Sequence, residues 1–438
     1  MRTASIAAAI SLVSWALCSE QRLLSDARSD SSVRFGASIG SSKGNPPAYR
    51  DALLELHKAL IDIESISGNE NAVGDFLAGY LSDRGYTVDL QAVASSKGRP
   101  DRPERFNILA WHGRGRHSPR VVVSSHIDVV PPHIPYGIED GPVDESTMIR
   151  GRGSVDAKGS VAAMVLALDE LLHRDKAIRD EDVMLLFVVG EEVGGEGMRT
   201  FSDSLARMDQ PPSFGAVIFG EPTENKLACG HKGGLFCEMT AKGVPGHSGY
   251  PWLGKSANEL MVRALAKILD ADLGSSELFG NTTFNIGRFD GGVAGNVIPE
   301  HALVKMAARV AVGPEKTGSN LVRSKIEAIL NDVDPDAFHL DCTHGYGSVE
   351  CSCDVAGIPT PPCPRGGGEN VLTVLSGFDT IVVNYGTDIP NLAGDHRRYL
   401  YGPGNILVAH GARENLTVGD LETAVEGYKK LILHALKE

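Results

Sequence analysis

Histidine and acidic side chains that could bind a metal ion occur in five segments spread along the chain. Four of these segments are a short apolar run followed by an acid or a histidine, and the remaining one leads into a helical pattern. The residues of interest are His126, Asp128, Asp156, Glu191, Glu192, Glu221 and His410. One such residue alone is usually a solvated turn residue. Five segments together predict a shared site, because ligands gather at the carboxyl ends of strands in an open α/β sheet.

The composition of this set favours zinc. Imidazole and carboxylate ligands suit zinc, whereas calcium and magnesium prefer shells of oxygen atoms. None of the five segments contains a cysteine, so they do not form a thiolate structural zinc site. A carboxylate shared by two ions would hold them about 3.5–4 Å apart and produce a nucleophilic water near neutral pH. We therefore predict two zinc ions per subunit and a hydrolytic reaction.

The segments before and after these residues show alternating patterns of strands and helices. Short apolar runs with turn residues at their ends predict buried strands, and apolar residues at helical spacing predict helices. The expected strands are 107–111, 121–125, 183–189 and 216–219, and the expected helices are 51–63, 72–84 and 160–172. This alternation predicts an α/β sandwich around a largely parallel sheet.

The pattern changes from about residue 232. The expected order is strand 235–241, helix 256–269, strands 282–289 and 302–311, helix 319–331 and strand 337–342. This βαββαβ order is typical of a small separate domain. The first pattern then returns, with a helix opening at 372–375, a strand at 406–409 and a helix at 418–436. One domain is therefore predicted to be inserted into the other.

The N-terminus has the features of a secretory signal peptide. A positive start at Met1-Arg2 precedes an apolar stretch over 4–17, with small residues before Ser19. The alternatives are a buried helix or a membrane anchor, but the stretch is too short to span a bilayer. Residues 19–45 are rich in Ser, Arg, Gly and Pro, which predicts a flexible arm or propeptide. We expect a secreted, extracellular protein without a membrane partner.

Cysteine usage agrees with an oxidising compartment. Removal of Cys18 would leave six cysteines, an even number, whose 15 pairings stay open. A structural zinc site is disfavoured because Cys351-x-Cys353 is too tight for the usual knuckle. Asn281 and Asn415 begin glycosylation sequons. The formal net charge of −14 argues against a nucleic-acid partner.

The five segments together resemble the M20 metallopeptidase family. The matching motifs are His126-x-Asp128, Gly153-x-x-Asp156-x-Lys158-Gly159, Gly190-Glu191-Glu192, Gly220-Glu221-Pro222-Thr223 and the late His410. The resemblance implies a zinc-dependent exopeptidase α/β sandwich with an inserted ferredoxin-like lid or dimerisation domain. This fold agrees with the segmentation of the chain into a signal peptide at 1–18, an arm at 19–45, a catalytic domain at 46–231 and 346–438, and an inserted domain at 232–345.

The resemblance also implies roles for the predicted ligands. Asp156 would bridge both zinc ions, with His126 and Glu221 on one ion and Glu192 and His410 on the other. Asp128 would orient His126 from behind. Glu191 would act as the general base in the attack of a zinc-activated water. An ordinary acidic loop is the alternative for the Glu191-Glu192 pair, which we expect in an extended segment with its two side chains pointing apart.

Further residues match positions that contact the substrate in the family. His247 would supply an oxyanion contact from a partner subunit, which implies a homodimer through the inserted domain. Asn296, Arg309 and the turn at Gly402 would bind the substrate. Arg309 is suited to a substrate carboxylate, since a guanidinium binds carboxylates bidentately, although a surface arginine is the simpler interpretation.

Three functions remain open from the sequence. The expected one is a secreted metallocarboxypeptidase that removes the C-terminal residue of short peptides. The alternative is an N-acyl-amino-acid amidohydrolase of the aminoacylase or deacetylase kind, which Glu221 favours because some peptidase relatives carry Asp there. A binding protein on an inactive enzyme fold is disfavoured because every ligand and the expected base are present.

Overall fold

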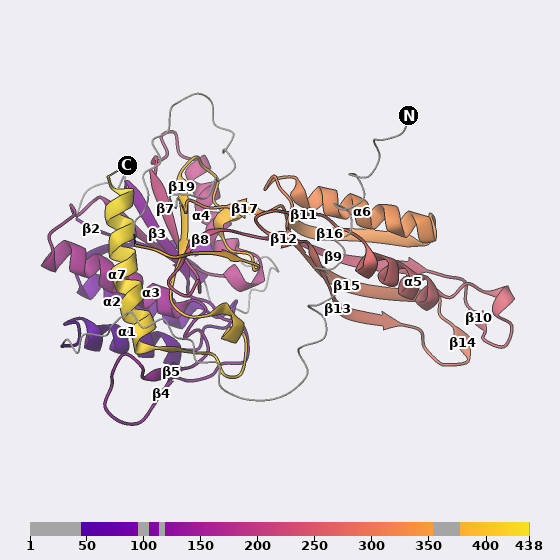
Figure 1. Ribbon diagram of the computed structural model, residues 1–438, viewed down its shortest axis with the longest axis horizontal. Helices are drawn as coiled ribbons and strands as arrows, with labels where there is room; N and C mark the ends of the chain where they lie inside the picture. The colour runs from indigo at the N-terminus through magenta and orange to yellow at the C-terminus, as the bar shows by residue number, and fades with distance from the viewer. Residues whose placement is uncertain (1–44, 95–104, 114–118, 354–376, 438) are drawn as a thin grey trace, which may run out of the picture. The chain divides into compact units, whose positions relative to one another are not determined.

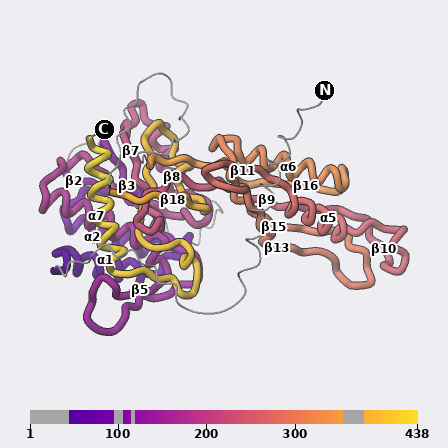
Figure 2. Tube along the Cα trace, viewed as in Figure 1, coloured from indigo at the N-terminus to yellow at the C-terminus, as the bar shows by residue number. Residues whose placement is uncertain are grey.

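The computed structural model describes residues 45–94, 105–113, 119–353 and 377–437. The predicted signal peptide, nearly all of the predicted arm, Cys363 and the expected helix start at 372–375 lie outside these residues. None of the described helices is long and apolar enough to cross a membrane. The elements appear in Figure 1, and the path of the backbone in Figure 2.

A six-stranded sheet forms the centre of the α/β part. Its order is β1-β2-β6-β3-β7-β19. The bounds are β1 Tyr86–Val93, β2 Arg105–His112, β6 Val183–Val188, β3 Val121–His126, β7 Ala216–Gly220 and β19 Arg397–Tyr401. Strands β6, β3, β7 and β19 run parallel, and β1 and β2 continue the sheet in antiparallel pairing. The largely parallel sheet is therefore confirmed.

Helices cover both faces of this sheet. The helices are α1 Arg50–Asp62, α2 Asn71–Asp83, α3 Lys158–Asp169, α4 Glu196–Ala206 and α7 Val418–Ala435. On β3, Val121 and Val123 belong to the core beneath α1, α3 and α7, whereas Val122 belongs to the core beneath α4. Every residue of β3 and β6 is buried. Burial on both faces explains why these strands read as continuous apolar runs.

The inserted part is a four-stranded antiparallel sheet with two helices. Its elements are β9 Gly233–Lys242, α5 Ala257–Asp270, β13 Thr283–Gly291, β15 His301–Val310, α6 Gly318–Val333 and β16 Phe338–Tyr346. The strand order is β13-β15-β9-β16. On β9, Leu235, Met239 and Ala241 pack against α5 and α6, and Phe236 points away. The expected βαββαβ plan is confirmed.

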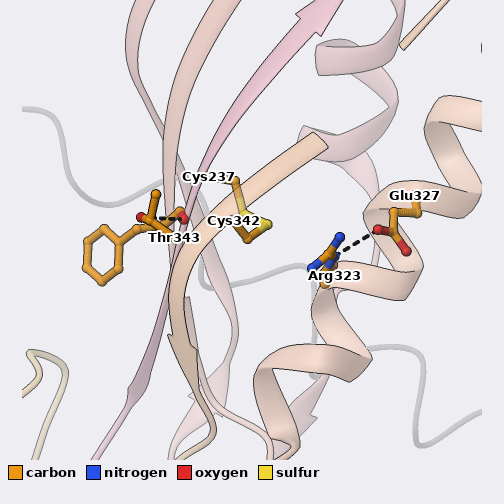
Figure 3. Close-up of a disulfide and its surroundings, with 6 residues drawn as sticks. Cys237, Arg323, Glu327, Cys342 and Thr343 are labelled. Atoms are coloured by element: carbon orange, nitrogen blue, oxygen red, sulfur yellow. Dashed lines mark hydrogen bonds and ion pairs between the residues drawn. A yellow bond between two sulfur atoms is a disulfide. The ribbon is translucent and has the colours of Figure 1, made fainter. Parts of the chain in front are cut away.

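The described residues contain two disulfides, one of which joins two strands of the inserted sheet. Cys237 of β9 is bonded to Cys342, its direct partner on β16, close to α6 (Figure 3). Cys229 of β8 (Leu227–His231) is bonded to Cys353. Four of the six cysteines expected in the mature chain therefore form disulfides, as predicted. Among the described residues, Cys351 has no disulfide partner.

Short elements complete the description. A three-stranded sheet has the order β20-β5-β4, with β20 Asn415–Thr417, β5 Met148–Arg150 and β4 Gly137–Ile138. Another has the order β17-β8-β18, with β17 Val349–Glu350 and β18 Thr380–Val383. Two ribbons consist of β10 Gly246–His247 with β14 Val297–Ile298 and of β11 Ser275–Ser276 with β12 Gly280–Asn281.

The expected strand at 406–409 was wrong. Residues Ile406–Val408 form a 3₁₀ turn, in which the Asn405 side chain accepts a hydrogen bond from Leu407 N at 2.8 Å. Leu407 is 87% exposed, so the run lacks the burial that a central strand needs. The strand of this region is β19, which the sequence did not suggest because it starts with Arg397 and Arg398.

Candidate metal centre

Asp156 lies between two groups of side chains that could each hold a metal ion. Its Oδ1 is 3.1 Å from His126 Nε2, which is 3.8 Å from Glu221 Oε1. Its Oδ2 is 3.1 Å from His410 Nε2, which is also 3.1 Å from Glu192 Oε2. Within each group one ligand atom of every member lies within 4.8 Å of the others. One carboxylate thus faces two groups of donors.

The fold explains how these residues meet. His126 ends β3, Glu192 follows β6 and Glu221 follows β7 directly, so all three stand at the carboxyl edge of neighbouring parallel strands. Asp156 comes two residues before α3, which packs behind the same strands. This is the edge at which open α/β sheets bind ligands.

The centre concentrates negative charge with few cations to balance it. Burial, together with repulsion by Glu221, raises the pKa of Glu191 well above its ordinary value. Burial likewise raises the pKa of Glu221 and that of Glu192. Carboxylates are expensive to bury unless they are paired or bind a metal. Two imidazoles and two further carboxylates around one shared carboxylate fit a pair of metal ions.

His126 is held with its Nε2 toward the centre. Its Nδ1 donates a hydrogen bond to the main-chain oxygen of Asp128 at 2.9 Å. The Asp128 carboxylate, which we expected to orient His126, is 3.6 Å away. That carboxylate instead accepts hydrogen bonds from the backbone N–H groups of Glu191 at 3.1 Å and Glu192 at 3.3 Å. Asp128 therefore fixes the turn that carries the two glutamates.

The Glu191-Glu192 pair does not lie in the extended segment that we expected. Residues Glu191–Val193 form a 3₁₀ turn that follows Gly190, whose φ is +73°. A Cβ at Gly190 would lie 2.3 Å from Arg105 Nη2, so only glycine fits there. The turn still separates the two side chains, because Glu192 joins the His410 group whereas Glu191 faces a cavity.

This cavity adds a residue that the sequence did not suggest. It is lined by His126, Glu191, Glu221 and Asp388, among others. Burial raises the pKa of Asp388 to about 6. Asp388 follows the apolar strand β18 after a short loop. An apolar run followed by an acid could have indicated Asp388 as a site residue. The loop between β18 and Asp388 made this pattern harder to recognise.

His410 reaches the centre from a loop, not from the end of a strand. Its φ is +60°, a left-handed value that is uncommon for a residue with a side chain. Its side chain is 52% exposed. Hydrogen bonds to Asp156 and Glu192 raise the pKa of His410 to about 10.

Two of the predicted substrate residues lie together in the inserted part. His247 is in β10 and pairs with Val297 of β14. The backbone oxygen of Asn296 accepts a hydrogen bond from Ser248 N at 3.0 Å. The His247 ring is exposed, and its Nδ1 accepts a hydrogen bond from Gly249 N at 3.0 Å. Neither residue belongs to the two metal-binding groups or to the cavity lining.

Arg309 and Gly402 have different surroundings. Arg309 reaches the loop that carries Gly386 and Asp388. A Cβ atom added to Gly386 would lie 3.8 Å from Arg309 Nη1 and 2.1 Å from Tyr346 Oη. Gly402 is buried, and its N–H donates to Thr223 Oγ1 at 3.0 Å. A Cβ there would lie 2.5 Å from the main-chain oxygen of Glu221. Gly402 therefore packs against the backbone of Glu221.

Comparison with known proteins decides the family. Residues 229–337 match the peptidase dimerisation domain of M20 enzymes, and residues 107–215 match peptidase family M28. A peptidase M20 domain-containing protein of Sordaria macrospora is 52% identical over 416 residues, which cover 90% of this chain and 87% of that protein. The chain belongs to the M20 peptidase family. An Aspergillus flavus protein named "Probable carboxypeptidase" is 45% identical over 88% of this M20 chain and 87% of its own length.

Solved structures show the same fold. A tripeptidase of Staphylococcus aureus has a TM-score of 0.67 at 19% identity and covers 89% of this chain and 99% of its own. An M20 metallo-carboxypeptidase of Sulfolobus solfataricus has a TM-score of 0.64 at 15% identity, with 88% and 99% covered. The predicted M20 resemblance and fold class are confirmed. The protein is a metallopeptidase with a peptidase dimerisation domain.

Proposed function

We propose that this M20 enzyme is a secreted zinc metallocarboxypeptidase that removes the C-terminal residue of short peptides. The observation that carries the proposal is the placement of Asp156, whose two oxygens each face one group of a histidine and a glutamate. Such a shared carboxylate is the arrangement that a co-catalytic metal pair needs. The mixed imidazole and carboxylate donors support zinc as the metal.

Once bound, a zinc pair would polarise the scissile carbonyl and make a water nucleophilic near neutral pH. The chain itself would move the proton. Glu191 lines the cavity beside His126 and Glu221, and its backbone is fixed by Asp128. Its raised pKa strengthens it as a proton acceptor. In this proposal, Glu191 takes a proton from the attacking water and delivers it to the leaving amine.

The preference for a free C-terminus is proposed from Arg309. Its guanidinium, which lies 5.9 Å from the centre of the Phe236 ring, reaches the Gly386 loop beside Tyr346. A guanidinium there is suited to a terminal carboxylate. The names of the carboxypeptidase relatives support the same substrate class.

His247 is proposed to act on the centre of a partner subunit. Its ring is exposed, its Nδ1 accepts a hydrogen bond from Gly249 N, and its domain matches the peptidase dimerisation domain. Mixing His247→Ala chains with Glu191→Ala chains tests this arrangement. Partial recovery of activity in mixed dimers supports it, because one centre then has both residues. Mixed dimers as inactive as either parent count against it.

Secretion is proposed from the N-terminal pattern and is supported by the disulfides Cys229–Cys353 and Cys237–Cys342. Expression of the full chain in a eukaryotic secretory host tests it. Recovery from the medium, with an N-terminus after Cys18, is the expected result. Retention of intact Met1 inside the cell would contradict it.

A substrate comparison tests the carboxypeptidase proposal. N-blocked dipeptides with a free C-terminus, the same dipeptides amidated, and N-acetyl amino acids are each incubated with the purified protein, with and without a chelator. Chelator-sensitive cleavage of the free-carboxyl dipeptides alone is expected. Preference for N-acetyl amino acids would move the enzyme to the amidohydrolase alternative, which Glu221 favours on sequence grounds.

A further inference from the structure

A buried ion pair outside the predicted ligands contacts both loops of the metal centre. Arg152 and Glu414 expose 2% and 1% of their surface, and Arg152 Nη1 lies 2.5 Å from Glu414 Oε2. A buried charge pair is expensive to desolvate and needs further hydrogen bonds to be tolerated. The partners that supply those hydrogen bonds indicate what the pair does.

Glu414 holds the loop that carries Asp156. Its Oε1 accepts hydrogen bonds from the backbone N–H groups of Gly153 at 2.9 Å, Val155 at 3.1 Å and Asp156 at 3.2 Å. Three donors on one carboxylate oxygen fix the backbone of this loop. The direction in which the Asp156 side chain leaves the backbone is fixed with it.

Arg152 holds the loop that carries His410. Its Nη2 donates to the backbone oxygen of His410 at 3.1 Å, and its Nη1 donates to that of Gly411 at 3.2 Å. His410 has a left-handed φ, which a side chain disfavours. The guanidinium therefore supports a backbone conformation that aims the imidazole at Asp156.

The two loops are each connected to one strand of the same antiparallel pair, β5 and β20. Strand β5 leads into the Asp156 loop, the His410 loop leads into β20, and Arg150 of β5 is paired with Asn415 of β20. This pairing brings Arg152 and Glu414 together. The ion pair then joins the loops on the side toward the centre.

We propose that Arg152 and Glu414 are positioning residues that set the geometry of the metal pair. The inference rests on the metal pair of the proposed function. Glu414 acts through Asp156, which both metal-binding groups share, whereas Arg152 acts mainly through His410, which belongs to one group. The two residues should therefore affect the two ions differently. Residues that orient metal ligands typically contribute 10- to 100-fold to metal affinity.

Zinc titration against a competing chromophoric chelator tests this on the full chain. Arg152→Lys keeps the charge but cannot reach Glu414 and both backbone oxygens at once. It should weaken one zinc ion about 10- to 100-fold and leave the other within about threefold. Glu414→Gln should weaken both ions. Unchanged affinities in either variant, or equal weakening of both ions in Arg152→Lys, would overturn the proposal.

Glu422→Gln is the matched control. Glu422 forms the same kind of ion pair, with Arg50, and this pair joins α7 to α1 without touching a metal-binding loop. Its zinc affinities should equal those of the wild type, and circular dichroism should show all three variants folded. If the control loses as much zinc as Arg152→Lys does, the effect is general destabilisation. That result would overturn the proposed positioning role of Arg152 and Glu414. A wild-type chain that binds fewer than two zinc ions would overturn the metal pair itself, before any variant is compared.

Discussion

At the scale of single residues, one turn directs two neighbouring glutamates to different surroundings. Glu192 faces Asp156 and His410, whereas its neighbour Glu191 faces the cavity beside His126. Asp128 holds both residues through their backbone N–H groups. The two glutamates should therefore respond differently to substitution.

Glu191→Gln should lower kcat by about 10²- to 10⁴-fold, the usual contribution of a general base. Zinc content should stay unchanged because Glu191 belongs to neither metal-binding group. Steady-state kinetics and zinc analysis of the same preparation measure both. Glu192→Gln is the matched comparison and should lose zinc as well as turnover. A Glu191→Gln enzyme with most of its activity would show that the base is another residue.

Zinc binding at neutral pH should release protons. In the metal-free centre, hydrogen bonds to Asp156 and Glu192 raise the pKa of His410 to about 10, so the ring is charged at pH 7.5. A zinc ligand must be neutral imidazole, so binding displaces that proton. The apparent affinity should therefore rise with pH up to about pH 10. Calorimetry in buffers of different ionisation enthalpy counts the protons, and a value of zero at pH 7.5 would contradict the role of His410.

The sequence predicted the five residues that meet around Asp156 because each stands in a motif that can be recognised locally. It did not predict Asp388, Arg152 or Glu414, whose roles depend on partners far along the chain. Glu414, for example, contacts Gly153 and Asp156 more than 250 positions away. The roles of the ligands remain predictions until metal binding is measured.

At the scale of elements, continuous burial made the central strands predictable. Strands β3 and β6 are buried at every residue, so their apolar runs were visible. Strand β1 at the sheet edge is buried only at its two end residues, Tyr86 and Val93, and was missed. The opposite error occurred at Ile406–Val408, where an apolar run forms an exposed turn. Burial from distant elements decides such cases, and a local pattern does not contain it.

Removal of the Cys237–Cys342 disulfide would show how much this bond stabilises the inserted sheet. It joins directly paired residues of β9 and β16, 105 positions apart. The double variant Cys237→Ala/Cys342→Ala should lower the free energy of unfolding by about 2–4 kcal/mol, mainly because the unfolded chain gains freedom. Urea denaturation measures this change, and zinc content serves as the control because both cysteines lie outside the metal-binding groups. A change below about 0.5 kcal/mol would contradict the expectation.

At the scale of the whole molecule, buried neutral histidines should make the fold sensitive to acid. Burial lowers the pKa values of His57, His231 and His396 to about 4. His57 contacts the backbone oxygen of Ser154 and His231 contacts Thr387, so each joins segments far apart in the chain. Protonation of these rings would leave charges in the core.

The contribution of these histidines to the stability of the fold should therefore fall as the pH drops from 6.5 to 4. Below pH 6.5 the unfolded chain binds protons that the folded chain excludes, and this difference ends near pH 4. Each fully buried histidine contributes up to about 1.4 kcal/mol per pH unit in that window. Urea denaturation of the metal-free protein at several pH values, compared with His231→Gln, isolates one histidine. An unchanged slope in that variant would contradict the assignment.

We propose that one carboxylate, that of Asp156, would hold two metal ions together in this peptidase. Anomalous diffraction at the zinc edge from crystals of the zinc-loaded protein tests it most directly. We predict two peaks per chain about 3.5–4 Å apart, one beside His126 and Glu221 and the other beside Glu192 and His410, with Asp156 between them. A single peak, or two peaks that do not share Asp156, would contradict the account.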